Sequence, residues 1–443
     1  MIRHIDSILK FFVTACILTF AGTAQAQQAH SRDICKPKGI SILGDSRDGY
    51  SLYVDGRKTY IKGVGGTNRL DIARENGANA CRTWGGNVET IDRGLALARE
   101  NGMYMMQGIS LSKRAADYKD ETYRNRILGF VREIALRYRE DTTILVWGIG
   151  NEIELAGANG AEQWRFVNEI SELLHSLDGR HLTSTVISHN PSALDSLAKY
   201  APDLDLVGIN SYGNIGVADE MVARSAYDGP YMITEWGPTG WWETAKTEWG
   251  APIEQTSEEK RQVYEQRYTD YILGSKCCLG SFCFLWGQKE ERTPTWFCMF
   301  VEDDVPGLPL SGEKTPMVEA MQRVWTGCEP RQTAPVVNGM TVAGRRGVES
   351  PRVEAMTPFN ASVTVQDREG DVLTFVWENL REATVTASGG AYEPRPERVG
   401  EVVSTKGPSV TLPGLAPGEY RLYCYIFDGT GYVATANVPY QVK

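Results

Sequence analysis

Basic charge and histidine are both scarce in this chain of 443 residues. Its 46 Lys and Arg residues are outnumbered by 56 Asp and Glu residues, which leaves a net charge of −10. A surface that binds nucleic acid needs a concentrated excess of cations, so the composition argues against a nucleic-acid partner. It also disfavours a polyanionic substrate, although a local basic cleft is compatible with an acidic protein.

Patterns that bind metals or nucleotides are missing as well. The chain has five histidines, and its cysteine spacing, with Cys277 and Cys278 adjacent, does not match a zinc site. The glycines at 63–66 lack the spacing of a phosphate-binding fingerprint, which weakens the case for a doubly wound open sheet. We therefore expect no metal and no cofactor.

A long apolar run occurs at the N-terminus and nowhere else. Residues 8–21 are mostly apolar, follow a weakly basic start, and precede the small residues Ala24 and Ala26. This order predicts a signal peptide over residues 1–26 and export to the periplasm or the medium. An uncleaved anchor is the alternative, although the run is short for a bilayer span. After cleavage the cysteine number is even, and we expect one to three disulfides.

Short apolar runs alternate with amphipathic stretches through most of the chain. Helical patterns cover residues 88–101, 121–139, 161–177, 255–274 and 314–326. The strands are expected at residues 60–65, 79–84, 103–109, 144–149, 182–187, 205–210, 230–235 and 280–286. Such an α/β alternation predicts a (β/α)8 TIM barrel within residues 27–329, preceded by a hairpin at 38–62.

The composition changes near Pro330, where a proline-containing linker gives way to strand patterns. Residues 330–443 are therefore predicted to form a small immunoglobulin-like β-sandwich. This module either binds glycan or serves as a spacer. Asp367, Glu369 and Asp371 crowd one of its turns, and they indicate either a calcium site or a solvated polar hairpin.

Two carboxylates follow barrel strands that face each other. Glu152 comes after the fourth strand and Glu235 ends the seventh, and active sites of such barrels lie at the C-terminal ends of the strands. One carboxylic acid and one opposing carboxylate are what glycosidic cleavage requires. An acid must keep its proton, so we expect a raised pKa for Glu152, while Arg82 and Tyr212 would stabilise the charge of Glu235.

These residues give the chain a resemblance to the clan of retaining glycoside hydrolases built on (β/α)8 barrels, which includes cellulase-like, mannanase-like and β-galactosidase-like families. The resemblance covers residues 60–326 and is carried by the motifs Arg82, 147–152, Tyr212, 234–236 and Trp286. It implies that Glu152 is the acid/base, that Glu235 is the nucleophile, and that Asn151 binds the 2-hydroxyl of the reacting sugar. By the same resemblance Trp286 floors the cleaving subsite.

The chain departs from the clan pattern in two places. Ile153 stands where many members have proline, and no histidine follows the third or the sixth strand. Trp84 and Trp236 are additional candidates for sugar contact, and Trp241 and Trp242 are as easily surface residues as sugar platforms. Glu154 is expected to be solvated or to contact an outer subsite.

The sequence predicts an exported retaining β-glycoside hydrolase that cleaves a neutral β-linked glycan, with β-glucan favoured. A transglycosylase using the same carboxylates is one alternative, and a catalytically silent carbohydrate-binding protein is another. The expected partner is the carbohydrate substrate. We expect no membrane span after signal cleavage, and the sequence leaves the oligomeric state open.

Overall fold

The computed structural model describes residues 33–36, 39–155, 160–302, 305–386 and 393–443. The predicted signal peptide, residues 1–26, lies outside the described residues. Within the described ranges, no helix has the length and apolar character needed to cross a bilayer.

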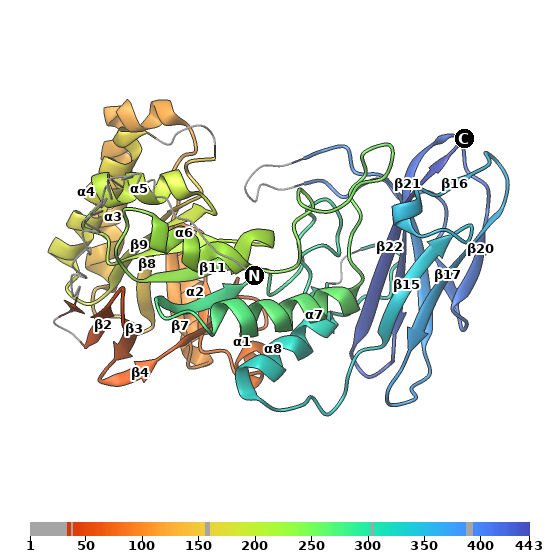
Figure 1. Ribbon diagram of the computed structural model, residues 1–443, viewed down its shortest axis with the longest axis horizontal. Helices are drawn as coiled ribbons and strands as arrows, with labels where there is room; N and C mark the ends of the chain where they lie inside the picture. Colours follow the sequence, from red (N-terminus) through yellow and green to blue (C-terminus); the bar gives the residue numbers. More distant parts are fainter. Residues whose placement is uncertain (1–32, 37–38, 156–159, 303–304, 387–392) are drawn as a thin grey trace, which may run out of the picture.

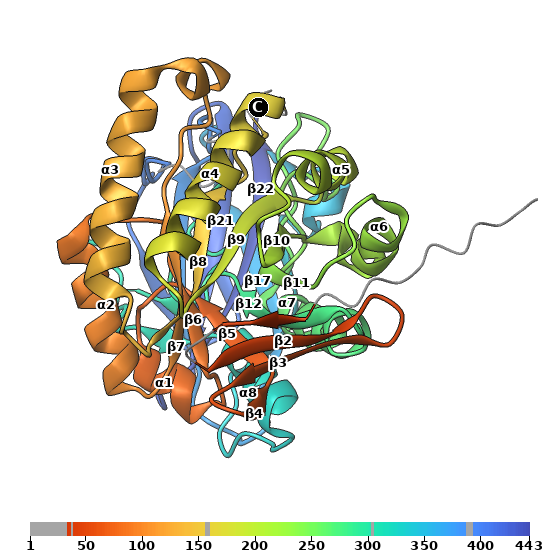
Figure 2. The ribbon, with the colours of Figure 1, turned by 90° about the vertical axis from the view of Figure 1, so that its left-hand side faces the viewer.

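The first part of the chain is a closed parallel barrel of eight strands (Figures 1 and 2), as predicted. It closes where β12 pairs with β5, with Gly280 opposite Ile61. Nearly every strand residue is buried, because the barrel interior covers one face and the helices cover the other. The strands are β5 (Ile61–Gly65), β6 (Ala80–Arg82), β7 (Tyr104–Ile109), β8 (Ile144–Asn151), β9 (Leu182–Ser188), β10 (Leu206–Asn210), β11 (Tyr231–Trp236) and β12 (Cys278–Cys283).

Helices surround the barrel, and the five predicted ones are all present. Three shorter helices, α1, α5 and α6, were missed because 6 to 10 residues span too few turns for a clear apolar period. The helices are α1 (Leu70–Glu75), α2 (Val88–Glu100), α3 (Glu121–Tyr138), α4 (Ala161–Leu177), α5 (Pro191–Tyr200), α6 (Ala218–Arg224), α7 (Ser257–Arg267) and α8 (Pro316–Thr326). Single turns of other types occur at η1 (Ala115–Lys119), η2 (Gly213–Val217), η3 (Tyr268–Ile272) and η4 (Gly347–Glu349).

An antiparallel sheet closes the bottom of the barrel. The predicted hairpin belongs to four strands, β1 (Ile34–Cys35), β2 (Ile40–Asp45), β3 (Gly49–Val54) and β4 (Arg57–Thr59). Its apolar face, including Ile42 and Leu52, packs with residues near the starts of barrel strands, such as Ile61 and Leu206. The opposite end of the barrel, where the strands finish, is left for a site.

The C-terminal region is a β-sandwich of two sheets, as predicted, and its two core-facing layers enclose an apolar cluster around Trp377. The three-stranded sheet is β15 (Val336–Val342), β17 (Phe359–Gln366) and β20 (Ser409–Leu412); the five-stranded sheet is β16 (Arg352–Val353), β22 (Val433–Val442), β21 (Gly418–Phe427), β18 (Thr374–Arg381) and β19 (Val403–Thr405). A small ribbon, β13 (Phe300–Val301) with β14 (Glu313–Lys314), precedes α8. The immunoglobulin-like topology and the boundary at residue 330 stay predictions.

The prediction of disulfides is wrong for the described residues, in which all eight cysteines are free thiols. Cys81 and Cys283 pair with Val64 from the strands on either side of it. Two strand spacings, about 9.6 Å, therefore separate them, which is beyond the roughly 7 Å that a disulfide can bridge between Cα atoms. Both thiols are fully buried and act as small apolar side chains.

Barrel and sandwich lie side by side (Figure 1), and a buried polar network joins them. Glu254, in the loop before α7, accepts hydrogen bonds from Thr293 at 2.6 Å and from Asn437 of β22 at 2.6 Å. Its other oxygen is 2.5 Å from Lys260 Nζ, and both side chains of this ion pair are 1% exposed. Arg421 of β21 adds a bond to the carbonyl of Pro252. The two parts therefore share an ionic centre as well as apolar packing.

This network generates a stability prediction. Lys260→Met leaves the Glu254 carboxylate buried without its cation, and we expect unfolding to become easier by about 3 kcal/mol. Thermal or urea unfolding measures the change. Arg93→Met, which removes an exposed pair with Glu89 on α2, is the control and should leave the melting temperature unchanged. Equal behaviour of the two variants would contradict a structural role for the buried pair.

Candidate active site

Side chains from four barrel strands meet at the C-terminal end of the barrel. Arg82 ends β6, Asn151 ends β8 with Glu152 directly after it, Asn210 ends β10, and Glu235 lies in β11. Parallel strands deliver their last residues to the same rim, which is why positions far apart in the sequence gather here. The predicted pairing of Arg82 with Glu235 is present, at 2.9 Å.

Glu235 is surrounded by hydrogen-bond donors. Its Oε1 accepts from Arg82 Nη1 at 2.9 Å and from Trp84 Nε1 at 2.6 Å, and its Oε2 accepts from the Tyr212 hydroxyl at 3.3 Å. A cation and two neutral donors stabilise negative charge on a carboxylate. Both oxygens of the Glu235 carboxylate are therefore bonded, which holds the side chain in one orientation.

Arg82 lies beneath the rim of the barrel, where its side chain is only 2% exposed. Besides Glu235, it donates to the carbonyl oxygen of Thr234 and to Asn151 Oδ1, each at 2.7 Å. Burial lowers the pKa of the Arg82 guanidinium, and the negative charge of Glu235 opposes this effect. Arg82 does not itself line the cavity described below, so it acts by orienting groups that do.

Glu152 has the opposite environment. Burial, reinforced by the charge of Glu235, raises its pKa to about 7. A 3.0 Å hydrogen bond from Asn210 Nδ2 and the charge of Lys113 oppose the increase. Its backbone adopts the left-handed conformation, with φ of 49°, which is uncommon for a residue with a side chain.

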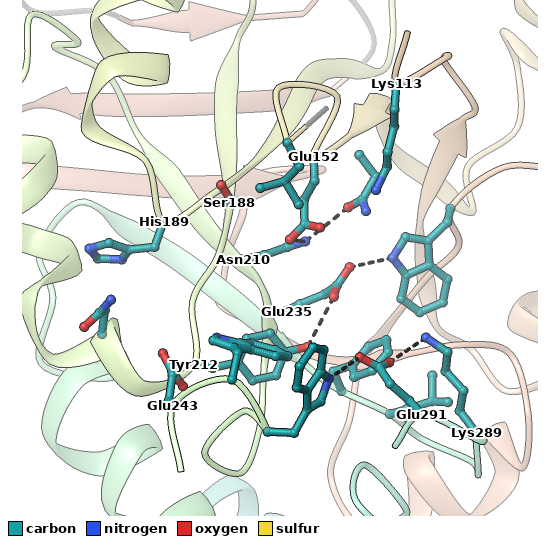
Figure 3. A pocket seen from close by; sticks show the side chains of 18 of the residues that line it. Lys113, Glu152, Ser188, His189, Asn210, Tyr212, Glu235, Glu243, Lys289 and Glu291 are labelled. Carbon is teal, nitrogen blue, oxygen red and sulfur yellow. Dashed lines mark hydrogen bonds and ion pairs between the residues drawn. The ribbon is translucent and has the colours of Figure 1, made fainter. Parts of the chain in front are cut away.

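A cavity of about 800 Å³ opens over both carboxylates (Figure 3). Glu152 and Glu235 face into it together with Trp84, Asn151 and Tyr212. Trp241 and Trp242 also line it, so these two residues form part of an aromatic wall. Sequence reasoning missed several further lining residues, most of which lie on loops that have no periodic pattern: Lys113, Ser188, Asn214, Glu243, Phe284, Lys289 and Glu291. Asn210 was identifiable, since it ends a predicted strand.

The structure corrects the predictions for two tryptophans, both 0% exposed and absent from the cavity wall. Successive strand residues point to opposite faces, so Glu235 facing the mouth turns Trp236 toward the helices, where it packs on Tyr264. Trp286 packs on Phe300, and its indole nitrogen donates to a backbone carbonyl. Phe284 and Leu285 take the place in the wall that Trp286 was expected to have.

Glu154 was expected to be solvated or to touch an outer subsite, but it is buried, at 4% exposure. Its Oε1 accepts from the backbone nitrogen and the hydroxyl of Ser188, and burial raises its pKa. The loop after β8 thus holds two adjacent buried carboxyl groups with separate partners. Only Glu152 faces the cavity.

Within the described ranges, no group of three or more His, Cys, Asp or Glu side chains is arranged to hold a metal ion. In the sandwich turn, Asp371 accepts from Gln332 and Glu369 accepts from Thr333. These carboxylates therefore bind protein donors in a polar turn.

Comparisons with known proteins reach only the level of the fold. No protein-family model matches the chain, and no curated protein matches it. Among solved structures it is similar to a β-glucuronidase from Bacteroides uniformis, with 14% identity and a TM-score of 0.48, over 91% of this chain and 48% of that one. A β-glucuronidase from Ruminococcus gnavus (13% identity, TM-score 0.49, 65% and 52% covered) and a β-galactosidase from Marinomonas ef1 (11%, 0.43, 59% and 58%) are also similar. The chain thus spans about half the length of these proteins, and activity must be argued from its own site.

The environment of Glu152 generates a prediction that needs no substrate. Because its pKa in the folded protein, about 7, lies above the ordinary value of 4.5, the unfolded chain ionises first as the pH rises. The contribution of Glu152 to the stability of the wild-type protein therefore falls between pH 4.5 and about 7. The Glu152→Gln side chain cannot ionise, so the melting temperature of this variant should rise relative to that of the wild type as the pH increases from 4.5 to about 7.

The measurement is a series of thermal unfolding curves from pH 4 to pH 8. At pH 4 the Glu152 carboxyl is protonated in both states, which makes that pH the internal control. A difference in melting temperature that stays constant from pH 4 to pH 8 would contradict the buried, protonated Glu152.

Proposed function

We propose that the protein is a retaining β-glycoside hydrolase, with Glu152 as acid/base and Glu235 as nucleophile. One observation carries the proposal: two carboxyl groups share a cavity but have opposite environments. Burial raises the pKa of Glu152 to about 7, whereas Glu235 accepts hydrogen bonds from a cation and two other donors. A protonated carboxylic acid opposite a carboxylate that is held by donors is what the acid and nucleophile roles require.

The double displacement follows from this placement. Glu235 attacks the anomeric carbon while Glu152 protonates the departing glycosidic oxygen, which leaves the glycone covalently attached to Glu235. Glu152, now ionised, removes a proton from water as the water attacks the anomeric carbon. The bond to Glu235 breaks, and the sugar is released with its β configuration retained.

Asn151 is positioned for the 2-hydroxyl of the reacting sugar. Its Oδ1 accepts from Arg82 Nη2 at 2.7 Å and from Asn210 Nδ2 at 3.2 Å, which fixes the orientation of the amide and leaves its NH2 group on the other side. Trp84, which donates to Glu235, and Tyr212 complete the floor around the reacting carbon. The aromatic wall suits the C–H faces of a neutral sugar, and we favour a β-glucan as substrate. Export to the periplasm or the medium rests on the N-terminal sequence alone.

The two carboxylates are distinguished by their alanine variants. Glu235→Ala removes the nucleophile, so turnover of every substrate should fall by several orders of magnitude. Glu152→Ala removes only proton transfer, so a dinitrophenyl β-glycoside, whose leaving group needs no proton, should still form the glycosyl-enzyme. Added azide should then restore turnover of Glu152→Ala and yield a β-glycosyl azide.

The rates of both variants are measured with and without azide, and NMR identifies the first-formed anomer. Glu302→Ala, at the same end of the barrel but outside the cavity, is the control and should keep wild-type rates. Rescue of Glu235→Ala by azide with retained configuration would reverse the two roles. Near-normal activity of both variants on glycan, or an α-anomer as first product, would contradict the proposal.

A further inference from the structure

Residues 289–292, which follow β12, contact both the cavity and the β-sandwich. Lys289 and Glu291 line the cavity, and their side chains form an ion pair with Nζ 2.7 Å from Oε2. The other oxygen of Glu291 accepts from the indole nitrogen of Trp241 at 3.4 Å. The residues between and after them, Glu290 and Arg292, instead contact the β-sandwich. One short stretch therefore connects the candidate active site to the second domain.

The sandwich holds this segment by charge and by the backbone. Arg395 lies 3.4 Å from the Glu290 carboxylate. Glu393 accepts a 2.6 Å hydrogen bond from the backbone nitrogen of Arg292, and the hydroxyl of Thr386 accepts from the guanidinium of Arg292 at 3.2 Å. Three residues from one loop of the sandwich thus bind two neighbouring residues of the barrel.

The anchors on the sandwich side are themselves fixed. Arg395 donates at 2.6 Å to Glu378 of β18, a side chain that is 0% exposed. On the barrel side, Arg292 has φ of 63°, in the left-handed region that costs free energy for a residue with a side chain. Such a conformation persists where surrounding contacts hold it, and here contacts from the sandwich add to a backbone bond from Thr293 to Glu291 across the turn.

The anchored segment lies at the glycone end of the cavity. Glu152 is hydrogen-bonded to Asn210, whereas Glu235 is hydrogen-bonded to Tyr212. Burial raises the pKa of the Tyr212 hydroxyl, and the nearby charges of Glu235 and Glu291 add to this effect, so Glu291 lies on the Tyr212 side of the cavity. In Figure 3 the labelled Glu235 lies between Glu152 and the Lys289–Glu291 pair. Because the acid must adjoin the leaving group, the side beyond the nucleophile holds the glycone.

We propose that the β-sandwich is a positioning element of the active site, which holds Lys289 and Glu291 against the hydroxyl groups of an uncharged glycone. This rests on the proposed function and deepens it. Lys289 donates and Glu291 accepts, as hydroxyl recognition requires. Since the two charges cancel, the pair favours a neutral sugar over a uronic acid, whose carboxylate would meet Glu291. Thr386 of the sandwich also lines this end.

Arg395→Met tests the positioning role, because it removes the cation that bridges Glu290 and Glu378. We expect the KM for an aryl β-glycoside to rise about tenfold, the loss expected when a charged hydrogen-bonding group is displaced, with kcat changed by less than about threefold. Arg352→Met is the matched control: it removes another ion pair between sandwich and barrel, with Glu248, whose residues do not line the cavity. Its KM should equal that of the wild type.

A double-mutant cycle with Glu291→Gln separates positioning from general destabilisation. If Arg395 acts through the segment, the double variant should have nearly the KM of Glu291→Gln alone, whereas independent effects would multiply. Thr386→Val, which removes one acceptor of Arg292, should shift KM in the same direction by a smaller factor. It serves as the readout if Arg395→Met does not fold.

The outcomes keep the two proposals apart. Absence of wild-type activity on every β-glycoside tested would overturn the proposed function. Wild-type activity combined with equal KM values for Arg395→Met, Thr386→Val and Arg352→Met would overturn the positioning role alone, as would multiplying effects in the cycle. Aryl β-glucoside and aryl β-glucuronide are compared on the wild type, and a higher kcat/KM for the glucuronide would overturn the assignment of an uncharged glycone.

Discussion

The buried guanidinium of Arg82 is the constraint on which the mouth of the barrel depends. A cation taken out of water is stable only with good partners, and Arg82 has them at the ends of β8 and β11: Asn151, the Thr234 carbonyl and Glu235. Two of these partners, Asn151 and Glu235, face the cavity. The positions of the Glu235 carboxylate and of the Asn151 amide beside Glu152 are therefore set by the burial of one charge.

The same arrangement gives the carboxyl groups of Glu152 and Glu235 different surroundings. Three donors bind the Glu235 carboxylate, whereas burial, reinforced by the charge of Glu235, raises the pKa of Glu152 to about 7. The two environments are linked, because Asn210 donates to Glu152 and accepts from Arg82, which in turn donates to Glu235. The surroundings of both carboxyl groups thus belong to one connected set of hydrogen bonds.

The β-sandwich adds contacts at the far end of the cavity, where Lys289 and Glu291 lie. Domains joined by flexible linkers share small polar interfaces, whereas here the centre around Glu254 and Lys260 is fully buried between barrel and sandwich. Such an interface holds the two parts in one relative position. The loop that carries Lys289 and Glu291 can then rely on contacts from the sandwich in addition to those within the barrel, such as the bond from Trp241 to Glu291.

The sequence by itself determined the barrel, the sandwich and the placement of Glu152, Glu235, Arg82 and Tyr212 at the mouth, since buried strands are read from short apolar runs and their last residues share one rim. Tertiary structure alone decided the rest. Burial of Trp236 and Trp286 depends on which face of a strand or loop meets a helix, and no local pattern specifies that. The thiols stay apart because the order of strands in the barrel sets their distance. The partnership of residues 289–292 with the sandwich joins segments about a hundred residues apart, so it exists only once both domains have packed.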